Sequence, residues 1–195
     1  MPLPPIKLFG ARLMLEPVEE QLTGTIKAAT NAAKVNELGK IVAVGDGWEK
    51  TPTGDLNQVD MKLAVGDIVM FQMPKAWIFA CQVKLEGKLY MTLKYGDVIA
   101  KLSDHVITTD TVKVTGSWLL LTPFDDKNPG VIIVPESSDF KSKSLRYRVA
   151  QHGHLVTGIP VGQEVILDRG RMTALAIGAD TFFYIDLANV IGLVN

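Results

Sequence analysis

Two histidines and two aspartates are the residues whose type and spacing could support metal binding or acid–base chemistry. His152 and His154 lie two positions apart in QHGHL, and Asp125 and Asp126 are adjacent in PFDDKNPG. Zinc sites use Cys, His or carboxylate ligands, and QHGHL has no Cys, Asp or Glu close by. The aspartates adjoin Lys, Asn and Pro-Gly, which is typical of a solvated turn. Both groups therefore favour ordinary structural roles.

Other signs of enzymatic chemistry are missing from the sequence. It contains no G-x-S-x-G, P-loop or dinucleotide-binding fingerprint. The single cysteine, Cys81, excludes an internal disulfide framework and a thiolate-cluster metal site. We therefore predict a protein that is not an enzyme and that uses no cofactor and no metal.

Charge and hydropathy exclude further classes of function. Lys and Arg number 20 against 21 Asp and Glu, for a net charge of -1, whereas a nucleic-acid binder usually carries a basic excess. The basic stretch KSKSLRYR (141–148) is interpreted as a solvated strand face. No apolar run reaches the roughly 18–20 residues that cross a bilayer, and MPLPPIKLFGARL lacks a signal-peptide pattern. We expect no nucleic-acid or membrane partner and a cytoplasmic protein, in the host cytoplasm if it is viral, with an organelle matrix left open.

Short apolar runs, separated by Gly, Pro, Asp or charged residues, predict an all-β protein. Each run has four to eight residues rich in Val, Ile, Leu and aromatics, the pattern of strands in a sandwich or barrel. KAATNAAK (27–34) alone has helical propensity, and it is too short to be stable by itself. The runs are RLMLEP (12–17), KIVAVG (40–45), DIVMFQ (67–72), WIFACQV (77–83) and KLYMTL (88–93).

Three segments of the first half of the chain recur later in the same order. RLMLEP (12–17) resembles WLLLTP (118–123), AVGDIVMF (64–71) resembles PVGQEVIL (160–167), and GDVIAKL (96–102) resembles ANVIGLV (188–194). Ordered internal similarity indicates two copies of one all-β unit. We expect the units at residues 1–103 and 104–195, joined near the polar, Thr-rich segment 103–116 and held close together. The alternative is one larger β domain with chance similarity.

The first unit resembles the GroES-type co-chaperonins, the small lids of group I chaperonins. The similarity rests on RLMLEP, GKIVAVGDG (39–47), LAVGDIVMF (63–71) and LYMTLKYGDVIAKL (89–102). The second unit has the same motifs in the same order with more substitutions, and VAQHGH (149–154) replaces VAVGDG. The resemblance implies two tandem GroES-like, partly open β-barrels.

In that family the segment after the first strand is a mobile loop, whose aliphatic motif docks on the chaperonin. The second unit matches this motif in GVIIVPES (130–137), followed by the polar SDFKSKS. The resemblance thus implies a chaperonin-binding loop made of Gly130, Val131, Ile132, Ile133, Val134 and Pro135. The loop of the first unit is degraded: around Thr25 and Ile26, Lys27 stands where an aliphatic residue is expected. We predict that this first loop is a poor ligand for a chaperonin or binds something else.

The family also has a β-hairpin that forms a roof over the ring centre. The first unit carries a matching insertion, GDGWEKTPTGDLNQVDMK (45–62), with its turn at Thr53, Gly54 and Asp55. In the second unit, HGHLVTGIPVG (152–162) leads almost directly into the next strand. One unit therefore keeps the roof and the other keeps the docking loop.

Energy arguments link the docking loop to an oligomer. Burying three aliphatic side chains yields about 1.5–3 kcal/mol each, and ordering the loop costs about 1–2 kcal/mol per residue. One loop would bind weakly, whereas several loops on one ring would bind well. The expected partners are therefore further copies in a homo-oligomeric ring and a group I chaperonin in its ATP- or ADP-bound state.

Two alternative interpretations stay open from the sequence. The run VIIV (131–134) could be a buried core strand instead of a docking motif. The chain could also be an oligomeric structural or decoration protein that reuses the GroES-like fold. In that case its partners would be capsid subunits of a virus, and GVIIVPES would clamp a neighbouring subunit.

Overall fold

The computed structural model of the chain consists of short strands and two short 3-10 helices in the part that it describes. The described residues are 6–18, 34–74, 81–103, 108–123, 146–167, 172–177 and 180–194. The 3-10 helices are η3 (Tyr95–Asp97) and η4 (Leu187–Asn189). The all-β prediction is confirmed. None of the helices in these ranges has the length and apolar character needed to span a membrane.

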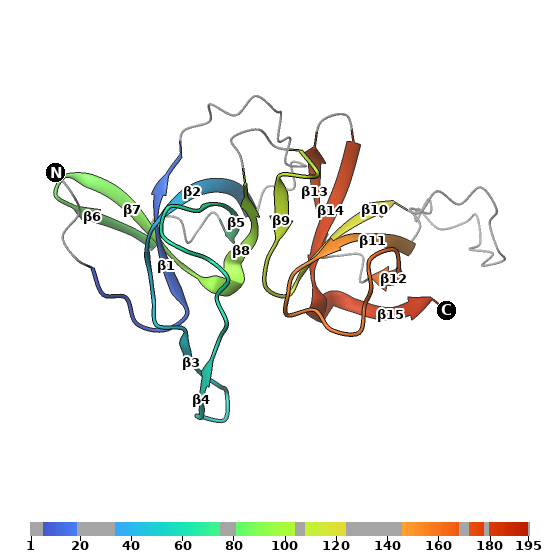
Figure 1. Ribbon diagram of the computed structural model, residues 1–195, viewed down its shortest axis with the longest axis horizontal. Coiled ribbons are helices and arrows are strands. Elements are labelled where there is room, and N and C mark those ends of the chain that lie inside the picture. The colour runs from blue at the N-terminus through green and yellow to red at the C-terminus, as the bar shows by residue number, and fades with distance from the viewer. Residues whose placement is uncertain are drawn as a thin grey trace.

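The first half of the chain forms a seven-stranded sheet in the order β6-β7-β1-β2-β5-β8-β9. A separate two-stranded hairpin, β3 (Trp48–Lys50) with β4 (Leu56–Gln58), projects from it (Figure 1). The strands of the sheet are β1 (Arg12–Pro17), β2 (Lys34–Val44), β5 (Ile68–Pro74), β6 (Gln82–Leu85), β7 (Lys88–Lys94), β8 (Val98–Leu102) and β9 (Val112–Val114).

The second half forms a six-stranded sheet in the order β13-β14-β10-β11-β12-β15. Its strands are β10 (Trp118–Pro123), β11 (Arg146–His152), β12 (Glu164–Leu167), β13 (Thr173–Ile177), β14 (Asp180–Asp186) and β15 (Val190–Val194). Except for β9, each strand of the first sheet occupies the same position in the strand order as one strand of the second sheet.

The two sheets agree in register as well as in strand order. The β1–β2 pairing shifts between Met14 and Leu15, and the β10–β11 pairing shifts between Leu120 and Leu121. A second matched shift occurs in the β5–β8 and β12–β15 pairings. Bulges are specific features of a fold, so the similarity of the halves is not chance. Two residues that occupy the same place in this repeat are called counterparts below.

Each half has its own apolar core. In the first core, Leu13 and Leu15 of β1 lie in one cluster with Phe71. In the second core, Leu119 and Leu121 of β10 lie in one cluster with Leu167, the counterpart of Phe71. Alternation along β1 and β10 directs these side chains to one face of the sheet. The halves are therefore two partly open barrels, each built around its own interior.

A third core cluster joins the two barrels. It combines residues of the first unit, among them Leu38, Met70 and Ile99, with residues of the second, among them Phe182 and Tyr184. Figure 1 shows the two barrels side by side, with β9 between them. Because apolar surface buried between the units stabilises their contact, the units form one block.

One segment differs from the sequence-based prediction. Residues 103–116 were expected to form a polar joining segment, yet Val112–Val114 is strand β9, and Val112 is 1% exposed. Its alternating V-K-V pattern places Val112 and Val114 on the shared core. Most of WIFACQV lies outside the described residues, and the described strand that its end belongs to, β6, begins at Gln82. KAATNAAK lies almost entirely outside the described residues.

Candidate functional site

The two loops expected to bind a partner leave the barrels at equivalent places. The first runs between β1 and β2, and the second between β10 and β11. Next to these loops, Pro17 pairs with Gly39 in the first sheet and Pro123 with Tyr147 in the second. The fold therefore anchors both loops at the same end of the same strand pair.

Both strands of the β3–β4 hairpin are exposed. Its turn is held by Thr51 and Asp55, because the Thr51 N–H donates to the Asp55 carbonyl at 2.8 Å and the Asp55 N–H donates to the Thr51 hydroxyl at 3.1 Å. Thr53 donates to the Asp55 carboxylate at 2.9 Å, and Gly54 takes a φ of 96° that favours glycine. Leu56 remains 69% exposed. The tip is thus an ordered turn with an apolar side chain available for contact.

The base of the hairpin is fixed to the first barrel by backbone contacts around Gly45. A Cβ atom at Gly45 would lie 2.1 Å from the Gly10 carbonyl oxygen, so only glycine fits there. The Asp46 carboxylate accepts from the Gly10 N–H at 2.8 Å and from the Trp48 N–H at 3.2 Å. The same close approach recurs in the second unit, where a Cβ atom at Gly153 would lie 2.2 Å from the Gly116 carbonyl oxygen.

The hairpin also touches the second unit near its return strand. An imidazole nitrogen of His154, Nε2, lies 2.9 Å from the Asp60 carbonyl oxygen, and the His154 ring lies 6.3 Å from the Tyr95 ring. Burial raises the pKa of Tyr95 to about 12, an effect that the nearby backbone groups of Gly116 and Lys62 partly oppose. Tyr95 is therefore neutral at physiological pH, and its ring is part of the contact between the units.

Comparisons with known proteins agree with this architecture. Residues 5–102 match the family model of the chaperonin 10 kDa subunit, Cpn10. The chain belongs to the Cpn10 family. It is 37% identical over 97 residues to the co-chaperonin GroES of Lacticaseibacillus zeae, which covers 49% of this chain and 97% of that protein.

Other members of the Cpn10 family give the same picture. The co-chaperonin GroES of Clostridioides difficile is 34% identical over 97 residues, covering 49% of this chain and 95% of that protein. That of Aquifex aeolicus is 32% identical over 91 residues, covering 47% of this chain and 69% of that protein. One such relative therefore corresponds to about half of this chain, as expected for a tandem arrangement of GroES-like units.

Two of the three predicted site segments of this Cpn10-family chain lie outside the described residues. These are the aliphatic segment Gly130–Pro135, including Ile132, Ile133 and Val134, and the first loop, Thr25–Lys27. The third segment, Thr53–Asp55, is the tip of the β3–β4 hairpin. The roles assigned to all three stay predictions.

The histidines singled out in the sequence have structural roles. His152 and His154 contact backbone carbonyls, those of Gly153 and Asp60 respectively. Over the described ranges, no group of three or more His, Cys, Asp or Glu side chains could hold a metal ion. His154 instead connects the second barrel to the hairpin of the first, a role that the spacing of QHGHL does not reveal.

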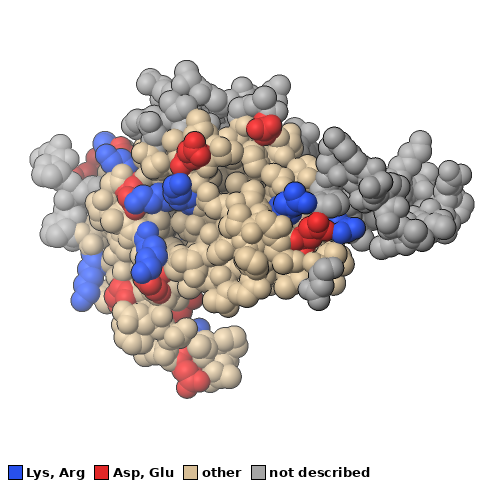
Figure 2. Space-filling model, turned by 45° about the vertical axis from the view of Figure 1, so that its right-hand side comes forward, with Lys and Arg blue, Asp and Glu red and all other residues tan. Residues whose placement is uncertain are grey.

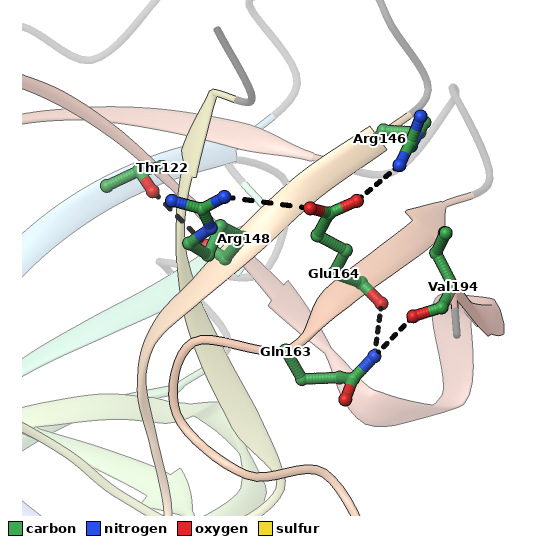
Figure 3. Close-up of polar contacts among 6 residues, drawn as sticks. All are labelled: Thr122, Arg146, Arg148, Gln163, Glu164 and Val194. Atoms are coloured by element: carbon green, nitrogen blue, oxygen red, sulfur yellow. Dashed lines mark hydrogen bonds and ion pairs between the residues drawn. The ribbon is translucent and has the colours of Figure 1, made fainter. Parts of the chain in front are cut away.

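Charged side chains are intermixed over the described part of the face shown in Figure 2. In the second unit Glu164 of β12 accepts from Arg146 and lies 3.6 Å from Arg148, both on β11 (Figure 3). Gln163 donates to the Val194 carbonyl of β15 at 2.7 Å. Arg146 and Arg148 of KSKSLRYR therefore lie on a strand and are engaged by a carboxylate on the sheet, whereas Lys141 and Lys143 lie outside the described residues.

The sequence predicted that the two units are held close together, but it did not identify the residues that form their contact. The buried Gln72 side chain donates to the Tyr184 hydroxyl at 2.8 Å and to the Thr173 hydroxyl at 3.0 Å. The Trp118 indole N–H donates to the Gly96 carbonyl at 3.0 Å. These residues lie far apart in the chain, and the only local signal was the alternation in V-K-V of residues 112–114.

Proposed function

We propose that this chain is a co-chaperonin that caps a group I chaperonin in its ATP- or ADP-bound state and assists protein folding. Membership of the Cpn10 family carries this proposal, because the relatives matched over almost their whole length are co-chaperonins. The chain would act by binding and enclosure, as a non-enzymatic partner, in the cytoplasm of its cell or host.

The second unit would provide the docking loop. Its aliphatic residues Ile132, Ile133 and Val134 lie in the connection between β10 and β11, which the fold anchors beside the Pro123–Tyr147 pair. One loop gains about 1.5–3 kcal/mol per buried aliphatic side chain, most of which is offset by the cost of ordering it. Useful affinity then comes from several loops presented together.

The first unit would provide the roof. Its hairpin is anchored at Asp46 and exposed at Thr53–Asp55, so it can meet other hairpins without disturbing the barrel. In the second unit the corresponding connection, residues 153–163, contains no strand. The two units would therefore contribute different parts of one lid.

The test is capture of a group I chaperonin in the presence of ATP or ADP. The wild-type chain should be retained and should slow ATP hydrolysis by the chaperonin, and Ile133→Asp should abolish both effects. The matched control is Ile26→Asp in the first loop, which should retain binding. Equal binding by wild type and Ile133→Asp would refute the assignment of the docking loop, and failure of the wild type to bind would refute the co-chaperonin proposal.

A further inference from the structure

A hollow lined by cations lies on the first unit, beside the base of the β3–β4 hairpin. It has a volume of about 730 Å³, and its charged lining residues are Lys7, Arg12, Lys50 and Lys94 against one carboxylate, Glu49. Volumes between about 300 and 1,000 Å³ are typical of small-molecule sites. This basic hollow therefore has the size of a ligand site and an excess of positive charge, on a chain whose net charge is -1.

Two of the four cations form a like-charge pair on the sheet. Arg12 and Lys94 lie directly opposite each other in the β1–β7 ladder, and both are exposed. Across the described ranges, neither of them forms an ion pair with a carboxylate. Because like charges directly opposite each other destabilise a sheet, the pair lowers stability unless an anion lies between them. Residues that act against stability in this way are typical of functional sites.

The fold does not require this pair, because the second unit has a different one at the same place. The counterparts of Arg12 and Lys94 are Trp118 and Asp186, which lie opposite each other in the β10–β14 ladder. The Asp186 carboxylate accepts from the Ser117 hydroxyl at 2.6 Å. Paired cations at this place are therefore a property of the first unit alone.

The other two cations reach the hollow from separate segments. Lys50 lies on β3, on the same face of that strand as Trp48, because side chains alternate along a strand. The Lys7 ammonium lies 5.4 Å from the centre of the Phe9 ring, within cation–π range. In the part of the chain that the structure describes, both lysines lack a carboxylate partner. Charges of one sign beside apolar walls such as these rings attract ions of the opposite sign strongly.

Backbone hydrogen bonds join the segments that line the hollow. The Gly47 N–H at the hairpin base donates to the Gly10 carbonyl at 3.2 Å. The Tyr95 N–H, just after β7, donates to the Ala11 carbonyl at 2.9 Å. A ligand would therefore meet a largely preformed site, which lowers the entropy cost of binding.

We propose that the basic hollow binds a small polyphosphate anion, with Arg12 and Lys94 as its main contacts and Lys7 and Lys50 adding positive charge around it. A guanidinium group matches the oxygens of phosphate through two parallel hydrogen bonds, and lysine adds a compact charge. Several cations around one hollow favour a ligand with more than one negative charge. The near-neutral chain argues against a nucleic acid as the source of the phosphates.

The test is calorimetric titration of the full chain with sodium pyrophosphate at fixed ionic strength. Wild type should show saturable binding that weakens as sodium chloride is added. Arg12→Gln and Lys94→Gln should each raise the dissociation constant roughly 10- to 100-fold. The matched control is Lys84→Gln, at an exposed lysine of β6 outside the hollow, which should bind as wild type does.

Three outcomes of this titration would overturn the inference. They are no saturable binding by wild type, equal weakening in Lys84→Gln, and citrate binding as tightly as pyrophosphate, which would refute the assignment to phosphate. A second copy of the chain could instead bring acidic groups to the hollow. In that case Arg12→Gln would change the sedimentation of the protein while pyrophosphate would not bind, and this result would also overturn the inference. Because no chaperonin enters these measurements, they do not depend on the proposed function.

Thermal unfolding separates a ligand-binding role of Lys94 from a structural one. At low salt and without pyrophosphate, Lys94→Gln should raise the unfolding midpoint by roughly 1–3 °C, because it relieves the like-charge pair. With pyrophosphate the order should reverse, because binding stabilises the chain that keeps both cations. A lower midpoint of Lys94→Gln without ligand would show that Lys94 supports the fold and would contradict the proposal.

Discussion

The contact between the two units predicts different effects on stability for substitutions at two isoleucines that hold the same place in the repeat. Ile99 is 1% exposed within the shared core, and Ile191 is 68% exposed. Ile99→Ala removes three buried carbon atoms, about 0.8 kcal/mol each in lost transfer energy, and adds a cavity. The free energy of unfolding should therefore fall by about 2–5 kcal/mol. Ile191→Ala removes the same atoms from water-exposed surface and should change it by less than about 0.5 kcal/mol.

The assay is urea unfolding followed by far-ultraviolet circular dichroism and tryptophan fluorescence, at a concentration where the chain is a monomer. With a slope near 2 kcal/mol per molar urea, Ile99→Ala should lower the midpoint by roughly 1–2.5 M. Ile191→Ala should leave the midpoint almost unchanged. Similar shifts in the two variants would show that the units are not packed together through β8. Two separated transitions in the wild type would refute the shared core.

Three further substitutions probe other contacts. Gly153→Ala should destabilise the chain as strongly as a core truncation, because the new methyl group would lie 2.2 Å from the Gly116 carbonyl oxygen; thermal unfolding measures this. Tyr184→Phe should lower the free energy of unfolding by about 1 kcal/mol, because it removes the hydroxyl that accepts from Gln72; urea unfolding measures this. The pKa of Tyr95 is raised to about 12, above its ordinary value, so the folded state favours neutral tyrosine. The contribution of Tyr95 to stability should be constant below about pH 10 and fall between pH 10 and 12. Urea unfolding of the wild type and of Tyr95→Phe across this pH range measures that contribution.

The barrels could be predicted from the sequence because their signals are local. Strands such as β1 and β10 are short apolar runs bounded by turns, and matched runs such as RLMLEP and WLLLTP disclose the repeat. The junction could not be predicted, because Gln72 and Tyr184 are 112 positions apart and meet only through the fold. Strand β9 was missed for the same reason: three residues in a Thr-rich segment gain strand structure from β8, which they pair with.

In the candidate site, too, some features could be predicted from the sequence and others could not. The hairpin was expected from the resemblance to the co-chaperonins, with its turn at Thr53, Gly54 and Asp55, and the structure places these residues at its tip. That His154 reaches the backbone of Asp60 was not predictable, because it depends on how the second barrel lies against the first. The docking loops fall outside the described residues, so their assignment still rests on sequence.

Covalent linkage of the two barrels has a consequence for how this protein can evolve. In a ring of identical single-unit subunits, any amino-acid change at the contact appears at every contact at once. Here Trp118 and Tyr184 stand at the internal contact, while Arg12 and Thr92 hold the corresponding positions at the other end of the block. In the proposed homo-oligomeric ring, selection could therefore strengthen the contact inside the chain without changing the contact between copies, a freedom that follows from linking two units in one chain.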